Sequence, residues 1–194
     1  MIGLPPLVLA SGSPWRATML REAGLSVEVL PPPDREDEVT DPDPRVMAGG
    51  RAQQKARDVA ALRPEALVIG ADQVGHLDGI AFGKPRDEAD WLARLRSLRG
   101  RTHTLSTGLA LEAPGWSHLE VVDVHVTFRA DLSDEELLAY IALGEARGCA
   151  GGYMVERRGG WLVEKIDGDW MNVIGLPLTP LITALRRQGW RLPT

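Results

Sequence analysis

The chain has 194 residues, of which 44% are hydrophobic and 25% charged, and its formal net charge is -5. This length suits one domain with a sizeable core, so we expect residues 1–194 to form a single domain. The acidic balance argues against a nucleic-acid partner, because such binders usually need a broad basic surface. The single cysteine excludes an internal disulfide framework and fits a reducing compartment. No apolar run approaches the length of a bilayer span, and the N-terminus is unlike a signal peptide. We therefore expect a cytoplasmic protein without a membrane partner.

The first pattern in the chain is a strand that leads into a helix through a glycine turn. Residues 7–10 predict a short buried strand, and Ser13 followed by Pro14 predicts the start of a helix. The N–H groups and the positive dipole end of such a helix suit an anion. Ser11, Ser13 and Arg16 would surround the anion with donors, although an ordinary strand-to-helix turn fits the same residues.

Beyond this turn the chain alternates between strand and helix patterns. Helices are expected at residues 45–62, 86–98, 133–143 and 179–188. Strands are expected at residues 26–30, 67–74, 102–111, 119–128 and 161–166, with a turn at 172–177. Antiparallel hairpins are mixed into this alternation, which predicts an α/β fold with a mixed twisted sheet flanked by helices.

Charged residues at three places are candidates for chemistry. Asp72 follows an apolar run, so we expect it at the end of a buried strand, where ligands of open α/β sheets bind. Lys55 borders the apolar stripe of a helix, and its role depends on what faces it. The acidic segment 34–44 predicts a solvated loop that could deliver one carboxylate to the anion site.

Other chemistries fit the sequence less well. The four histidines lack the ligand spacing for zinc, and those in strand or hairpin regions are expected at the surface. No phosphate-binding Walker loop, dinucleotide fingerprint or nucleophile elbow is present. What remains is carboxylates with lysines and arginines around a phosphate-sized site, which suits phosphoryl chemistry assisted by Mg²⁺.

Several segments together resemble the Maf family of nucleoside triphosphate pyrophosphatases. They occur in the family order and are Leu9-Ala-Ser-Gly-Ser-Pro-Trp-Arg16, Ile69-Gly-Ala-Asp-Gln-Val74, Gly83-Lys-Pro85, Ala150-Gly151 and Gly175-Leu-Pro-Leu178. The resemblance implies two lobes with a central cleft, as in the inosine triphosphate pyrophosphatase fold. It also implies hydrolysis of a nucleoside triphosphate to the monophosphate and pyrophosphate with a divalent cation (Mg²⁺, Mn²⁺ or Co²⁺). A homodimer is a further expectation from the family.

The resemblance also assigns roles to individual residues. The catalytic set that it implies is Asp72, Glu36, Lys55 and Lys84. Asp72 matches the family's proton acceptor, and Asp72 with Glu36 would hold the metal. The residues around Glu36 depart from the family's usual Val-Asp-Glu, which leaves Asp34 and Glu38 as alternatives. Ser13 and Arg16 match the phosphate-binding turn.

Three positions, Trp15, Gln73 and Glu156, distinguish branches of the family. The pyrimidine branch has Arg, Thr and Gln there, whereas the set in this chain resembles the 7-methyl-GTP branch. A carboxylate can accept bonds from the guanine edge, and an indole attracts a cationic methylated purine. The resemblance therefore implies 7-methyl-GTP as the substrate. The alternatives are a pyrophosphatase for dTTP, UTP, CTP or other non-standard nucleotides, and a nucleotide-binding regulator of cell division. Trp15 packed on its helix and Glu156 in solvent remain the structural explanations.

Overall fold

The structure is a computed structural model that describes residues 4–33, 35 and 38–191. Within these residues a seven-stranded sheet has the order β2-β1-β3-β5-β6-β7, and β4 also pairs with β3. The strands are β1 (Leu7–Ala10), β2 (Val27–Val29), β3 (Leu67–Leu77), β4 (Ile80–Phe82), β5 (Thr102–Ala113), β6 (Trp116–Phe128) and β7 (Val163–Asp167). β1 runs parallel to β2 and β3, and the other pairs are antiparallel. The predicted α/β fold with a mixed sheet is confirmed.

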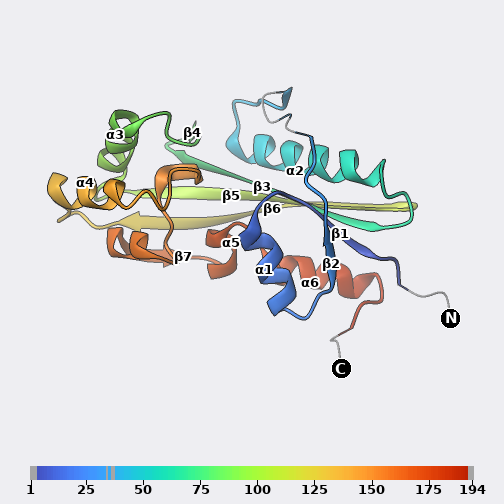
Figure 1. Ribbon diagram of the computed structural model, residues 1–194. Coiled ribbons are helices and arrows are strands. Elements are labelled where there is room, and N and C mark those ends of the chain that lie inside the picture. The colour runs from blue at the N-terminus through green and yellow to red at the C-terminus, as the bar shows by residue number, and fades with distance from the viewer. Residues whose placement is uncertain (1–3, 34, 36–37, 192–194) are drawn as a thin grey trace.

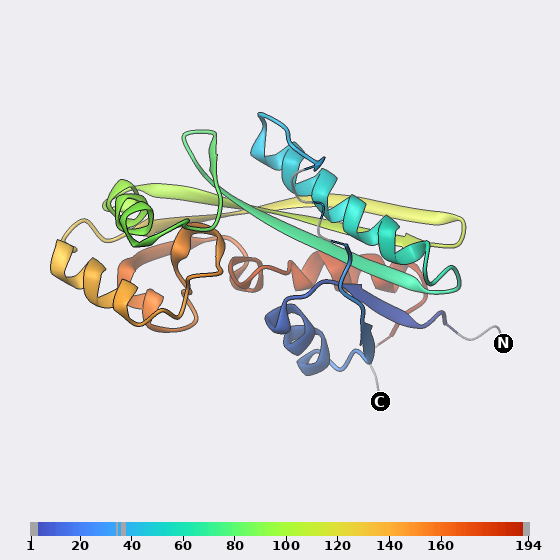
Figure 2. The same cartoon turned by 45° about the horizontal axis from the view of Figure 1, so that its top comes forward.

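Helices cover both faces of the sheet and the end at which β6 finishes, which we call the far end, as Figures 1 and 2 show. The helices are α1 (Pro14–Glu22), α2 (Pro44–Ala60), α3 (Glu88–Leu98), α4 (Asp134–Ala142), α5 (Trp170–Ile174) and α6 (Leu178–Arg187). α2 crosses one face, α1, α5 and α6 lie on the other, and α3 and α4 pack at the end where β6 finishes (Figure 1). Across the described part of the chain, no helix is long and apolar enough to span a membrane.

α2 lies unusually close to the sheet because two glycines lie beneath it. A Cβ atom added to Gly70 would lie 2.3 Å from the carbonyl oxygen of Ala52, and one added to Gly108 would lie 2.3 Å from that of Ala48. Only a residue without a side chain allows the helix backbone to approach β3 and β5 to this distance. The two glycines therefore determine how α2 sits over the sheet.

The apolar core is divided between the faces and the far end. Leu9, Ile69 and Leu109 pack with α1 and α6, whereas Val8 and Val68 pack with the alanines of α2. The third cluster joins the far end of the sheet to α3 and α4 and includes Trp91, Leu95, Phe128 and Leu137. The cluster shared with α1 and α6 thus lies along the first half of β3, and the cluster shared with α3 and α4 lies beyond its second half.

The structure corrects three details of the predicted elements. β3 continues to Leu77, beyond the expected end at residue 74, because the Asp78-Gly79 turn lets β4 pair with its last residues. The 161–166 segment begins as the 3₁₀ helix η3 (Arg158–Leu162) and becomes extended only at β7. The first half of the expected turn at 172–177 belongs to α5, which Asp169 caps by accepting a hydrogen bond from Met171 N at 2.9 Å, and the chain turns at Gly175.

Candidate functional site

The edge of β3 is interrupted in the middle of the sheet. β1 pairs with β3 as far as the Ala10–Gly70 register, and β4 joins the same edge only at Gly75. Within the described residues no strand pairs with this edge along residues 71–74. A cavity of about 760 Å³ opens at the gap and reaches side chains from both faces of the sheet. The interruption explains how a buried central strand can present polar residues to a ligand.

Asp72 lies within this gap in the middle of β3, not at the strand end that we expected. Asp72 is 6% exposed, and Lys55 Nζ donates to Asp72 Oδ1 at 2.5 Å. Asp72 shares with Gly70 the face under α2, because alternate strand residues point to the same side. Lys55 therefore faces Asp72 instead of extending to water. The ion pair offsets the cost of burying the two charged side chains.

The turn after β1 forms the second wall of the cavity. Ser13 caps α1 by accepting a hydrogen bond from Arg16 N at 3.4 Å, and Ser13 N donates to Ser11 Oγ at 3.1 Å. The Arg16 guanidinium donates to the carbonyl oxygens of Ala71, at 2.7 Å, and Gly175, at 2.8 Å. Arg16 thus ties α1 to the interrupted edge of β3, which places its positive charge at the cavity.

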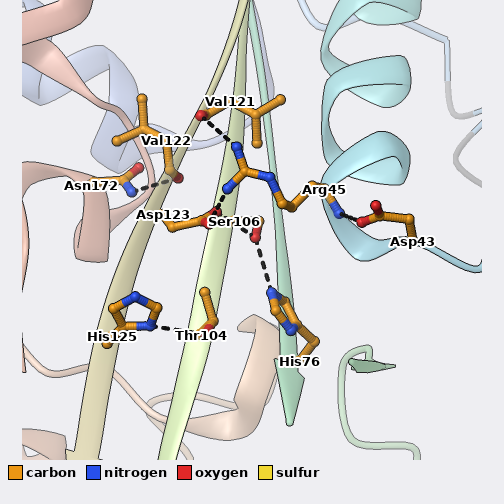
Figure 3. A network of polar contacts seen from close by, with 10 residues as sticks. All are labelled: Asp43, Arg45, His76, Thr104, Ser106, Val121, Val122, Asp123, His125 and Asn172. Atoms are coloured by element: carbon orange, nitrogen blue, oxygen red, sulfur yellow. Dashed lines mark hydrogen bonds and ion pairs between the residues drawn. The ribbon is translucent and has the colours of Figure 1, made fainter. Parts of the chain in front are cut away.

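Gln73 occupies the opposite face of β3 and is held by two bonds. Its Nε2 atom donates to Thr107 Oγ1 at 3.0 Å and to the carbonyl oxygen of Asn172 at 2.7 Å. Asn172 is itself buried in α5 and donates from Nδ2 to the carbonyl oxygen of Val122 at 2.9 Å (Figure 3). Because both Nε2 hydrogens are engaged, a ligand can bond to the Gln73 side chain only through its Oε1 acceptor.

The remaining wall is the segment 148–157, which three side chains from the far end of the sheet hold in place. Trp91 Nε1 donates to the Gly152 carbonyl oxygen at 2.6 Å, and Met154 N donates to Tyr140 Oη at 2.9 Å. His103 Nε2 lies 2.7 Å from Tyr153 Oη. Contrary to our expectation of surface histidines, His103 is 1% exposed, and burial lowers its pKa to about 4. A glycine-rich segment is therefore held by a small number of hydrogen bonds from buried side chains.

The structure brings together nine of the ten residues that the sequence singled out. All nine line the cavity: Ser11, Ser13, Trp15, Arg16, Lys55, Asp72, Gln73, Lys84 and Glu156. Glu36 and its alternative Asp34 lie outside the described residues, and Glu38 does not line the cavity. The side chains come from segments spread over the chain, so their convergence is a property of the fold.

Comparison with known proteins identifies the family of this chain. A family model described as "Maf-like protein" matches residues 6–188. The chain belongs to the Maf-like family. The match extends from β1 to the end of α6 and so includes every strand and helix named above.

Three relatives resemble this chain over most of its length. The dTTP/UTP pyrophosphatase of Deinococcus radiodurans is 40% identical over 185 residues, which are 95% of this chain and 94% of that protein. The dTTP/UTP pyrophosphatase of Nitratidesulfovibrio vulgaris is 38% identical over 185 residues, 95% of this chain and 88% of that protein. The nucleoside triphosphate pyrophosphatase of Streptomyces coelicolor is 43% identical over 183 residues, 92% and 88% of the two chains. These names do not support the expected likeness to the 7-methyl-GTP branch.

Sequence reasoning missed one cation of this Maf-like site. Arg51 lines the cavity from α2, one turn before Lys55, and its Nε donates to the carbonyl oxygen of Val39 at 3.0 Å. Residues four apart lie on the same face of a helix, so the spacing of Arg51 and Lys55 could have revealed it. The cavity thus gathers four cationic side chains on its lining: Arg16, Arg51, Lys55 and Lys84.

A second polar network lies on the α2 face, beyond the N-terminus of the helix (Figure 3). Ser106 Oγ donates to Asp123 Oδ1 at 2.7 Å and lies 3.0 Å from His76 Nε2, and Asp123 pairs with Arg45 of α2. Serine, histidine and aspartate also make up hydrolytic triads, but here Ser106 is fully buried and its hydroxyl donates to the carboxylate. The network therefore fastens the start of α2 to β5 and β6.

Proposed function

We propose that this chain hydrolyses dTTP or UTP to the nucleoside monophosphate and pyrophosphate. The observation that carries the proposal is the buried Asp72–Lys55 pair in a cavity lined by three further cations. The names of the family members from Deinococcus radiodurans and Nitratidesulfovibrio vulgaris support these two nucleotides over 7-methyl-GTP. The name of the Streptomyces coelicolor relative supports the pyrophosphatase class alone.

One side of the cavity suits the triphosphate, and we call it the phosphate end. It consists of Ser11, Ser13, Arg16, Arg51, Lys55, Asp72 and Lys84. The cations offset the negative charge of the phosphates, and cations already fixed in place stabilise charge that develops during the reaction. Arg16 is fixed by its bonds to Ala71 and Gly175, so it needs little rearrangement when a phosphate binds.

Asp72 is the proposed proton acceptor at this end. In the reaction a water oxygen forms a bond to the α-phosphorus, and the bond from that phosphorus to the oxygen bridging it to the β-phosphorus breaks. The proton of the water passes to the Asp72 carboxylate, and pyrophosphate leaves with the bridging oxygen. Lys55 donates to Oδ1 at 2.5 Å, which holds the carboxylate in place and leaves its second oxygen for the water.

A divalent cation fits this donor set when the substrate supplies further ligands. Among the described residues, no group of three or more His, Cys, Asp or Glu side chains could hold a metal ion. Mg²⁺ commonly binds through one or two carboxylates together with phosphate oxygens, and Asp72 offers one such carboxylate. When bound, the cation would neutralise phosphate charge. The expected second ligand, Glu36, lies outside the described residues.

We assign a second group of lining residues, the base end, to the nucleobase; it consists of Trp15, Gln73, Cys149 and Glu156. The Oε1 acceptor of Gln73 can take the N3–H of uracil or thymine, and the Trp15 ring offers an apolar surface for stacking. Neither contact requires a charged base. The base end is therefore compatible with the pyrimidines in the names of the two dTTP/UTP relatives.

Pyrophosphate release from dTTP, UTP, CTP, GTP and 7-methyl-GTP, measured with Mg²⁺ and with a chelator, tests the proposal. We expect the highest kcat/KM for dTTP or UTP and no release with the chelator. A clear preference for 7-methyl-GTP would contradict the substrate. Binding without release from any nucleotide would favour the regulator of cell division.

A further inference from the structure

Trp15 packs against a different part of the protein from the buried residues of α1. The buried residues of α1, such as Ala17 and Leu20, belong to the cluster shared with α6. Trp15 packs instead against the cluster that contains α3, α4 and Tyr153. Its indole therefore spans from the turn after β1 to the segment 148–157, along the lining of the cavity.

One face of this indole already carries a cation from the protein. The guanidinium carbon of Arg157 lies 5.0 Å from the centroid of the Trp15 ring, within the range of a cation–π interaction. Arg157 is an exposed residue outside the cavity lining, and it follows Glu156 directly in the chain. Its N–H donates to the Met154 carbonyl oxygen at 3.1 Å, so the turn that carries it is defined.

The presence of Arg157 changes how Trp15 and Glu156 should act together. An indole beside a carboxylate is a suitable site for a cationic base such as 7-methylguanine. Charges that act on the nearby Cys149 thiol include the carboxylate of Glu156 and the cations of Lys84 and Arg157. Arg157 therefore already supplies a positive charge to the Trp15 ring.

We propose that Arg157 determines base specificity by excluding cationic bases from the Trp15 ring. A methylated purine would have to compete with the guanidinium for the electron-rich ring and would be repelled by its charge. Neutral uracil or thymine stacks on the indole without this repulsion. The inference rests on the proposed function, and it gives a physical reason why a chain with Trp15 and Glu156 acts on pyrimidine nucleotides.

The test removes the charge of Arg157 and leaves its neighbour as a control. Arg157→Gln is compared with Arg158→Gln, the adjacent exposed arginine, and with Arg157→Lys, which keeps a cation. The measurement is kcat/KM for 7-methyl-GTP and for UTP at mildly acidic pH, where the methylated base is cationic. Arg157→Gln should raise the ratio of 7-methyl-GTP to UTP by roughly 2-fold to 5-fold, the range of a cation–π interaction at an exposed site. Arg158→Gln should leave the ratio unchanged, and Arg157→Lys should stay close to the wild type.

An unchanged ratio in a folded Arg157→Gln protein would overturn the inference, and so would an equal rise in Arg158→Gln. Calorimetric binding of 7-methyl-GMP and UMP provides a readout that does not need turnover. If the wild-type protein releases no pyrophosphate, the proposed function fails. The binding ratio in Arg157→Gln then still decides the role of Arg157, by rising or by staying at the wild-type value.

Discussion

The phosphate end and the base end of the cavity are supported in different ways. At the phosphate end, α2 rests on Gly70 and Gly108, and Lys55 reaches Asp72 directly from the helix. At the base end, the segment 148–157 depends on single hydrogen bonds from buried aromatic side chains, such as Trp91 to Gly152. Close backbone packing tolerates little displacement, whereas a segment held by a few bonds can shift. We therefore expect the chemistry to be insensitive to changes that alter the choice of base.

The strongest test of the phosphate end is Asp72→Asn. The amide keeps the size of the side chain and can still accept a bond from Lys55, but it cannot take a proton at neutral pH. Since general-base groups contribute roughly 10²–10⁴-fold, we expect kcat to fall by that factor with every triphosphate. Pyrophosphate release under saturating nucleotide measures the loss.

Asp131→Asn is the matched control, because Asp131 is an exposed carboxylate that pairs with Arg129 and does not line the cavity. Its kcat should stay near that of the wild type. Full turnover in a folded Asp72→Asn protein would remove Asp72 from the role of proton acceptor.

The next test concerns the packing that positions Lys55. In Gly108→Ala the new methyl group would lie 2.3 Å from the Ala48 carbonyl oxygen, so α2 must move away from β5. Overpacking of this kind typically costs about 1–3 kcal/mol of the free energy of unfolding. We expect urea denaturation to show this loss and kcat to fall with it, because Lys55 moves with the helix.

Gly83→Ala controls for the loss of a glycine, since a Cβ atom there would meet no atom within 4 Å. It should unfold at the wild-type urea concentration. If Gly108→Ala unfolded at the same urea concentration as Gly83→Ala, α2 would not be held by its contact with β5.

How well the sequence predicts each part of this site depends on how far apart along the chain the residues involved lie. The turn of Ser11, Ser13 and Arg16 is local, so capping rules sufficed to identify it. Asp72 was singled out for its apolar surroundings, but its place in the middle of β3 depends on where β1 ends and β4 begins. Such pairings between separate segments leave no local pattern.

The base end shows more clearly which features cannot be predicted from the sequence. Neither the buried His103 nor the bond from Asn172 to Val122 follows from periodicity, because each depends on which strands and helices meet. Arg157 adjoins a residue that was singled out, yet its position over Trp15 depends on contact between α1 and the distant segment 148–157. The ligand specificity of this fold is therefore less predictable than its chemistry.

The support of the base end should respond to pH through His103. Burial lowers the pKa of His103 from 6.5 to about 4, so the unfolded chain binds a proton more readily than the folded one. Stability from this group is present above pH 6.5 and is lost as pH falls toward 4. Linkage gives a loss of about 2 kcal/mol between pH 7 and pH 5.

Urea denaturation at the two pH values measures this loss, which should be absent in His103→Gln, because glutamine does not titrate. His125→Gln changes an exposed histidine of β6 and should keep the wild-type pH dependence. The same pH dependence in His103→Gln and the wild type would show that other groups cause it.

The smallest effect is expected from Tyr140→Phe, which removes one oxygen atom beneath the base end. Tyr140 Oη accepts the hydrogen bond of Met154 N at 2.9 Å, and both residues are buried. The loss of such a bond costs about 1 kcal/mol, so the segment that carries Glu156 should be less well held. We expect KM for the nucleotide to rise by up to about 5-fold, the equivalent of that energy, with kcat nearly unchanged.

Inhibition by pyrophosphate alone should stay at the wild-type value, because pyrophosphate needs only the phosphate end. Ser97→Ala, which removes an exposed hydroxyl bonded to Arg94 on α3, is the control and should alter neither quantity. Equal weakening of nucleotide and pyrophosphate binding in Tyr140→Phe would mean that the two ends are not independently supported.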